Sequence, residues 1–364
     1  MPKNIVICCD GTGNEFGEDN SNVVKLCQIL VRGQKEQSVF YDPGVGTSPV
    51  PDVTRTFWST LYKIKGLAFA TGISANIQQG YIFLMNNYED GDHVYLFGFS
   101  RGAYAARAIA GMVYACGLLT KDNAPMVEYA YKLYRDVHLK AALDKFKNTF
   151  SRQCKPHFIG LWDTVSSVGW AYERQNFPFT FRNPDVGIVR HAISIDERRA
   201  KFRTNKWGFP EDGQDVRQVW FVGVHSDIGG GYPEAESGLS KLALQWIVDE
   251  ACHSGLLCSA AAYDEVVLGV GGQYAAPSPR ATLHNSLTGA WTFLEWIPLP
   301  RWNPAKERDE LYTYHSQSRS IAEGSVVHQS VIDRMRDIPD YRPQNLTKAY
   351  TVEPYSTRPT NLWP

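Results

Sequence analysis

The sequence predicts an α/β fold, in which a mostly parallel sheet carries helices on both faces. Short apolar runs typical of buried parallel strands recur along the 364-residue chain, and segments with helical spacing lie between them. Polar clusters follow four of these runs, at Asp10, Ser100, Asp163 and His225. Because the sites of such sheets lie at the carboxyl ends of the strands, we expect the four clusters to converge.

The first half of the chain has the clearest pattern. The run NIVICC is a continuous apolar segment, and residues 71–87 place Ile73, Ile77 and Tyr81 on one side of a helix. We expect strands at 4–9, 38–41 and 93–98, and helices at 20–32, 71–87 and 103–113. The stretch 123–150 also has helical character, as an insertion that covers the site or as a surface excursion.

The second half continues the alternation and then loses it. We expect strands at 157–162 and 216–224, and helices at 186–203 and 237–252. The pattern predicts a catalytic core at 1–258, with insertions at about 45–70, 120–150 and 166–190, and an extension at 259–364 that packs on the core without forming an independent domain. The aromatic stretches 57–62 and 170–181 are candidate lids or acyl-chain walls, or ordinary core and loop aromatics.

Composition excludes several classes of protein. A net charge of -1 gives no basic footprint for nucleic acid, so we expect no nucleic-acid partner. No window of about 18 apolar residues indicates a spanning helix, and no signal peptide is recognisable. The seven cysteines include no C-x-x-C pair, which argues against zinc. We therefore expect synthesis in the cytoplasm, with export by a non-classical route open, and neither a metal nor another cofactor.

The segment from His93 to Ala110 contains the strongest chemical motif. Gly98-Phe99-Ser100-Arg101-Gly102 fits G-x-S-x-G and lies between an apolar run and an Ala-rich helical segment. Strand, tight turn and helix form the context in which such a serine is a nucleophile, with Gly98 and Gly102 allowing close approach of the backbone. The alternative is a glycine-rich turn in which Ser100 only caps the helix.

A serine nucleophile needs a base, and the base needs an acid to orient it. Ser100, Asp163 and His225 occur in the chain order nucleophile, acid, base that is expected of an α/β-hydrolase. Asp163 has an alternative role as a cap after its strand. His328 is the alternative base, because it also lies beyond Asp163.

Acyl transfer also requires hydrogen-bond donors for the oxyanion. The backbone N–H of Arg101 directly follows the proposed nucleophile and is the expected first donor. Gly11 and Thr12, after the first strand, are candidates for the second donor. The alternative at this place is a tight turn capped by Asp10.

Six motifs in order support a family resemblance. They are ICCDGTGN (7–14), FYDPGVGT (40–47), GFSRGAYAAR (98–107), GLWDTVSSVG (160–169), SIDERRAKF (194–202) and WFVGVHSDIGGGY (220–232). Over roughly residues 3–250 the chain resembles the DUF2235 family, which is similar to the catalytic domains of Tle1-type phospholipase effectors of the bacterial type VI secretion system. The resemblance implies an α/β-hydrolase fold, a triad of Ser100, Asp163 and His225, and cleavage of acyl esters of glycerophospholipids.

The sequence thus predicts a serine hydrolase that cleaves carboxylic acyl esters through an acyl-enzyme, as a phospholipase, lipase or esterase. Its expected partner is an acyl-ester or phospholipid substrate, with contact to a membrane surface. Two alternatives stay open: an acyltransferase with the same nucleophile, and an inactive binding module of the same fold.

Overall fold

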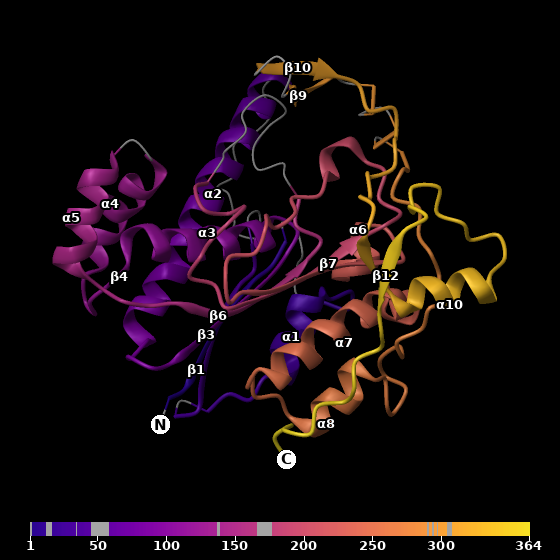
Figure 1. Cartoon of the computed structure of the whole chain (residues 1–364), viewed down its shortest axis with the longest axis horizontal. Helices are drawn as coiled ribbons and strands as arrows, with labels where there is room; N and C mark the ends of the chain where they lie inside the picture. Colours follow the sequence, from indigo (N-terminus) through magenta and orange to yellow (C-terminus); the bar gives the residue numbers. More distant parts are fainter. Residues whose placement is uncertain are drawn as a thin grey trace.

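A computed structural model of the chain shows a parallel sheet between two layers of helices (Figure 1). The structure describes residues 2–11, 17–33, 35–44, 58–136, 139–165, 177–289, 291–292, 295–296, 298–303 and 308–364. Thr12, residues 45–57 of the insertion expected at about 45–70 and the aromatic residues 170–176 lie outside the described residues, whereas 58–70 form the first part of a helix.

The main sheet has eight strands within the described residues, in the order β12-β11-β8-β7-β6-β3-β1-β2, and all its neighbours pair in parallel. The strands are β1 (Asn4–Cys9), β2 (Gln37–Asp42), β3 (His93–Phe99), β6 (Pro156–Trp162), β7 (Ile188–Ser194), β8 (Asp215–Phe221), β11 (Ser325–His328) and β12 (Tyr350–Glu353). The chain first builds outward from β1 to β2 and then, from β3 onward, in the opposite direction. Such a reversal opens a crevice at the carboxyl ends of β1 and β3, where ligands bind in sheets of this kind.

Alternating side chains of β1 show how the layers form. Val6 and Cys8 belong to the core shared with α1 (Asn22–Ile29) and α7 (Gly238–His253). Ile5, Ile7 and Cys9 belong to the core on the opposite face. That face carries α2 (Trp58–Asn87), α3 (Arg101–Cys116), α4 (Ala124–Arg135) and α5 (Lys140–Phe150). Because successive residues of a strand point to opposite faces, a fully apolar strand such as β1 is what a two-sided core requires.

The remaining elements are short and surround the sheet and its helices. They are the paired β4 (Leu118–Leu119) and β5 (Ser151–Arg152), the hairpin of β9 (Leu299–Asn303) and β10 (Arg308–Tyr312), the helices α6 (His225–Gly229), α8 (Ala260–Ala262) and α10 (Gln329–Asp337), and the short turns η2 (Ala200–Phe202), η3 (Glu234–Glu236) and η4 (Tyr263–Val267). Within the described residues, no helix combines the length and apolar character needed to cross a bilayer.

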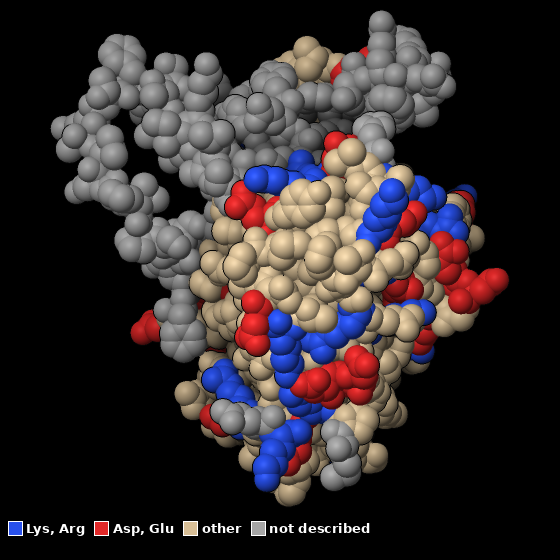
Figure 2. Space-filling view, turned by 90° about the vertical axis from the view of Figure 1, so that its left-hand side faces the viewer, with Lys and Arg blue, Asp and Glu red and all other residues tan. Residues whose placement is uncertain are grey.

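The predicted α/β fold, with a mostly parallel sheet and helices on both faces, is confirmed. The stretch 123–150 forms α4 and α5, which pack beside the C-terminal end of α3, where the Lys147 ammonium donates to the carbonyl of Tyr114 at 2.7 Å. On the face drawn in Figure 2, Lys and Arg lie interspersed with Asp and Glu, and the described residues form no extended patch of one sign.

One helix prediction is wrong. Residues 188–194 form the central strand β7, and only Ala200–Phe202 are helical in the segment 186–203. A charged side chain of this strand is paired inside the fold: the buried Arg190 guanidinium forms ion pairs with Glu250 and Asp215, each at 2.5 Å. Partners from elsewhere in the chain therefore let a central strand carry polar side chains, which no local pattern reveals.

The C-terminal residues contribute to the main sheet. β11 pairs with β8, and β12 pairs with β11, so the sheet extends beyond the last strand expected from the sequence. Both strands have only four residues, which is too short for a periodic signal. The division of the chain into a core at 1–258 and an extension remains a prediction.

Candidate active site

Ser100 lies on a tight turn between β3 and α3. Its backbone has φ 59° and ψ −119°, a conformation that side chains other than glycine rarely adopt and that is found at functional sites. A Cβ at Gly98 would lie 2.5 Å from the carbonyl oxygen of Gly102, and one at Gly102 would lie 2.2 Å from that of Cys9. The two glycines of the G-x-S-x-G motif are thus required by the close approach of β1, β3 and α3.

The carboxyl ends of β3, β6 and β8 bring Ser100, Asp163 and His225 together. The His225 Nε2 atom lies 2.8 Å from the Ser100 Oγ atom, and its Nδ1 atom lies 2.5 Å from the Asp163 Oδ2 atom. All three side chains are buried. Ser100 follows β3, Asp163 follows β6, and His225 begins α6 four residues after the last residue of β8. The chain of contacts has the order that a nucleophile, a base and an orienting acid require.

Backbone contacts hold the strand ends in register. The Ser100 N–H donates to the carbonyl of Trp162 at 3.0 Å, directly before Asp163 in the chain. The Asp163 N–H donates to Ala192 of β7 at 2.8 Å, and the Ser194 N–H donates to the Asp163 Oδ1 atom at 3.0 Å. The carboxylate therefore has a fixed direction before any substrate arrives.

The protonation states suit base catalysis. Burial disfavours the charge of Asp163, but the adjacent Arg319 and the hydrogen bond from His225 outweigh it and lower the pKa of this carboxyl below its ordinary value. Burial lowers the pKa of His225 below 6.5, although Asp163 opposes the shift. An ionised acid beside a neutral imidazole is the pair that can take a proton from Ser100.

Residues 3–250 match the family described as type VI secretion system phospholipase effector Tle1-like, catalytic domain. The chain belongs to this family. The uncharacterized protein YEL023C of Saccharomyces cerevisiae is 41% identical over 219 residues, which make up 55% of this chain and 32% of the yeast protein. The chain thus spans about a third of that relative's length.

Two solved structures are also similar to this Tle1-like chain. An uncharacterized protein from Pseudomonas aeruginosa shares 20% identity, with 75% of this chain and 48% of that chain covered and a TM-score of 0.42. The Tle1 effector bound to the VgrG spike from the type 6 secretion system shares 21% identity, with 66% and 53% covered and a TM-score of 0.36. The chain spans about half the length of each.

Two aromatic rings hold the imidazole of His225 in this Tle1-like site. The ring of Phe99 lies 4.6 Å from it, and the ring of Phe202 contacts it edge-on at 4.8 Å between centroids. Phe99 is the last residue of β3, whereas Phe202 ends the short turn η2. Packing on both sides restricts the rotation of the imidazole and keeps water away from it.

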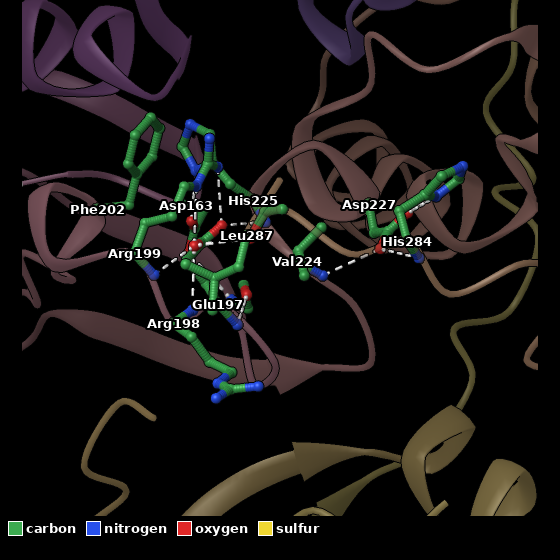
Figure 3. A network of polar contacts seen from close by, with 12 residues as sticks. Asp163, Glu197, Arg198, Arg199, Phe202, Val224, His225, Asp227, His284 and Leu287 are labelled. Carbon is green, nitrogen blue, oxygen red and sulfur yellow. Dashed lines mark hydrogen bonds and ion pairs between the residues drawn. The ribbon is translucent and has the colours of Figure 1, made fainter. Parts of the chain in front are cut away.

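Glu197 anchors the backbone of His225 from the loop after β7 (Figure 3). Its fully buried carboxylate accepts hydrogen bonds from the His225 N–H at 3.1 Å and from the Ser286 hydroxyl at 3.0 Å, and it forms an ion pair with Arg199 at 2.8 Å. Burial alone would raise the pKa of Glu197, but Arg199 lowers it to about 2. Glu197 lies within the motif SIDERRAKF, but no local pattern in the sequence indicates its contact with His225.

A second network holds the N-terminal turn of α6. The Asp227 carboxylate accepts from the Val224 N–H at 3.0 Å and lies 2.6 Å from the His284 Nδ1 atom (Figure 3). The His284 Nε2 atom lies 2.9 Å from Glu236, and these carboxylates raise the pKa of His284 despite its burial. Asp227 therefore closes the turn that carries His225, through one hydrogen bond to Val224 in the same turn and one to His284 in the C-terminal part of the chain.

The alternative base His328 lies elsewhere, at the end of β11. It is 2% exposed, its Nδ1 atom lies 2.9 Å from the Ser330 hydroxyl, and its ring stacks on Phe221 at 4.4 Å. It also caps α10 by accepting from the Ser330 N–H. Burial lowers its pKa to about 3, so it is a neutral structural histidine.

The expected oxyanion donors have different surroundings. Arg101 is the first residue of α3, so its backbone N–H lies at a helix N-terminus beside Ser100. The Gly11 N–H donates to the Asp10 Oδ1 atom at 2.6 Å, and Asp10 also accepts from the hydroxyls of Ser21 at 2.6 Å and Tyr41 at 3.1 Å. Asp10 thus caps the turn after β1, and Gly11 can serve an oxyanion only if this carboxylate releases its N–H.

A pocket of about 420 Å³ opens beside α3, one helical turn beyond Ser100. Its lining residues are Tyr104, Phe177, Phe179, Thr180, Phe181, Arg182 and Asn205. The described end of the aromatic stretch 170–181 therefore forms a pocket wall. Within the described residues, no group of three or more His, Cys, Asp or Glu is placed to hold a metal ion.

Proposed function

We propose that this Tle1-like chain is a serine hydrolase that cleaves carboxylic acyl esters of phospholipids. The observation that carries the proposal is the continuous contact from Ser100 through His225 to Asp163, with heavy-atom distances of 2.8 and 2.5 Å. A serine hydroxyl becomes a nucleophile near neutral pH only with such a base. Membership of a phospholipase effector family supports a lipid ester as the substrate class.

Acylation would begin when the Ser100 Oγ atom attacks the ester carbonyl carbon while the His225 Nε2 atom takes the hydroxyl proton. The carbonyl π electrons move to oxygen, and the backbone N–H of Arg101 stabilises the resulting oxyanion. When the tetrahedral intermediate collapses, the ester C–O bond breaks and His225 gives its proton to the departing alkoxide. The products of this half-reaction are a lysophospholipid and an acyl ester on Ser100.

Deacylation would repeat these steps with water as the nucleophile. His225 takes a proton from water, the hydroxide oxygen bonds to the acyl carbon, and the bond to Ser100 breaks as its Oγ atom recovers a proton. Asp163 keeps the imidazole in the tautomer with a proton on Nδ1 and stabilises the imidazolium in both halves. The products are a free fatty acid and the original enzyme.

The pocket beside α3 supports an apolar acyl group as one part of the substrate. Tyr104 and Phe177 form its buried wall, and Phe179 and Phe181 form an outer wall, with 37% and 59% of their surfaces exposed. Exposed apolar side chains that gather beside a groove are typical of surfaces that bind a ligand, a protein or a membrane. We propose that this wall contacts acyl chains or the surface of a membrane.

Turnover of defined esters tests the proposal. The purified chain is mixed with phosphatidylglycerol vesicles and, separately, with short p-nitrophenyl esters, and fatty acid and lysolipid are quantified. We expect release of fatty acid by the wild type and none by Ser100→Ala, while Ser254→Ala, altered at the end of α7, retains wild-type rates. Transfer of the acyl group to an added alcohol in place of water would indicate an acyltransferase. Release that persists in Ser100→Ala would overturn the proposal.

A further inference from the structure

Arg319 forms a two-pronged ion pair with Asp163. Its Nη1 atom lies 2.5 Å from Oδ1 and its Nη2 atom lies 2.9 Å from Oδ2, and its side chain is 3% exposed. Arg319 belongs to the C-terminal part of the chain, beyond the residues that match the family. A planar guanidinium that binds both oxygens of a carboxylate fixes its direction as well as its charge.

Hydrogen bonds join the segment 314–319 to the loop that contains Phe202, whose ring packs on His225. The Arg319 guanidinium donates to the carbonyls of Ser194 and Phe202, and Arg203 donates to Gln317 at 2.9 Å and to Ser318 at 3.3 Å. The carbonyl of Arg319 in turn accepts from the Asn345 amide at 3.0 Å. These contacts come from several parts of the chain and fix the position of Arg319 next to Asp163.

The ion pair has a consequence for His225. The Asp163 Oδ2 atom accepts from both His225 and Arg319, so the guanidinium balances the charge that would otherwise retain a proton on the imidazole. Charged and titratable groups that act on these side chains come from several elements. They are Asp163, Glu197 and Arg199 around His225, and Asp163, His191, Glu197 and Arg203 around Arg319.

We infer that Arg319 is a positioning residue for the reaction: it fixes the Asp163 carboxylate and keeps His225 unprotonated in mildly acidic solution. The inference rests on the proposed function. It means that the chain beyond the family match completes the catalytic geometry. An ion pair with a purely structural role would change stability when broken, but not the pH at which His225 becomes active.

The first test is the pH profile of kcat/KM for ester hydrolysis. In Arg319→Met the negative charge of Asp163 acts on His225 without compensation, so the acidic limb moves up by roughly one pH unit. Arg319→Lys keeps the charge but loses the two-pronged geometry, so its limb stays in place while kcat falls about tenfold to a hundredfold. The control Arg336→Met removes an exposed guanidinium from α10, in the same C-terminal part of the chain, and leaves the limb in place. Wild-type profiles and rates for both Arg319 variants, or an equal shift in Arg336→Met, would overturn the inference.

The second test does not need turnover. The His225 imidazole is titrated by NMR in the Ser100→Ala background, with and without Arg319→Met, and thermal melting verifies that each protein is folded. We expect the midpoint to rise by roughly one pH unit in the double variant; an unchanged midpoint contradicts the inference. If Arg319→Met does not fold, the rate of Arg319→Lys decides. Absence of ester hydrolysis by the wild type would instead reject the proposed function.

Discussion

Two histidines occupy equivalent places in this sheet and have different surroundings. His225 follows β8 and begins α6, whereas His328 ends β11 and precedes α10. Both are buried, both contact an aromatic ring, and burial lowers the pKa of both. His225 contacts a carboxylate and a serine on a strained turn, whereas His328 contacts the hydroxyl of Ser330.

The difference shows that a strand end alone does not make a catalytic histidine. β8 is separated from β3 by β7 and β6, and the segment after β8 returns toward the Ser100 turn through α6. A Cβ at Gly229 would lie 2.0 Å from the ring of Phe99, which shows how closely α6 approaches the end of β3. The backbone after β11 instead enters α10, and its histidine caps that helix.

Replacing each histidine with alanine should give the largest difference between the two sites. His225→Ala should lower kcat/KM for ester hydrolysis by at least about 10⁴-fold, because no base remains for Ser100. His328→Ala should retain most of the activity per folded molecule. Rates normalised to the folded fraction check this, and the reverse pattern would mean that the two roles are exchanged.

The side chain that contacts the Nδ1 atom of each histidine extends the same comparison. Asp163→Asn should lower kcat by about 10⁴-fold, because an amide cannot hold the imidazole in the required tautomer or stabilise its positive charge. Ser330→Ala should leave kcat near that of the wild type. Steady-state kinetics on one ester measures both variants; a fully active Asp163→Asn enzyme would show that this carboxylate only pairs with Arg319.

A smaller effect concerns acid stability at His328. Its pKa is about 3 in the folded chain and 6.5 when unperturbed, so the unfolded state binds the extra proton first. The stability contributed by the neutral ring is present above pH 6.5 and is lost as the pH falls, by about 2 kcal/mol between pH 6.5 and 5. His328→Asn keeps a cap for α10 without titrating.

Urea unfolding at both pH values measures this contribution. The wild type should lose about 2 kcal/mol more than His328→Asn on acidification. If both proteins lose the same free energy of unfolding on acidification, the His328 ring is in contact with water in the folded state.

Glu197 provides the test at the most acidic pH. Its pKa falls from an ordinary 4.5 to about 2, so the ionised carboxylate stabilises the fold above pH 4.5 and loses this effect as the pH falls toward 2. The stability advantage of the wild type over Glu197→Gln should shrink by roughly 3 kcal/mol across that range. Chemical unfolding at several acidic pH values checks the trend, and a constant difference would contradict it.

Local sequence patterns are sufficient to predict the strands and the polar residues that follow them. The apolar run of β3 and the glycines beside Ser100 predict the tight turn, because backbone contacts require both glycines. The order of Ser100, Asp163 and His225 predicts which residues the parallel sheet brings together, and the structure places them in contact. Their catalytic roles remain proposals.

Features that depend on distant partners had no local signal. The predicted helix at 186–203 is the strand β7 over residues 188–194, where the ion pair with Glu250 on α7 compensates the buried charge of Arg190. Arg319 follows no strand and lies in no motif, yet it contacts Asp163 across 156 residues of sequence. Only the folded chain reveals such pairs.

Reaction with a fluorophosphonate probe tests the central claim most directly, because the probe modifies a serine only when a base activates it. The wild type, Ser100→Ala and His225→Ala are treated with the probe, and the adduct is located by mass spectrometry of peptides. The account predicts one adduct on Ser100 in the wild type, none in Ser100→Ala and strongly slowed labelling in His225→Ala. A folded wild type whose Ser100 is not labelled would contradict it.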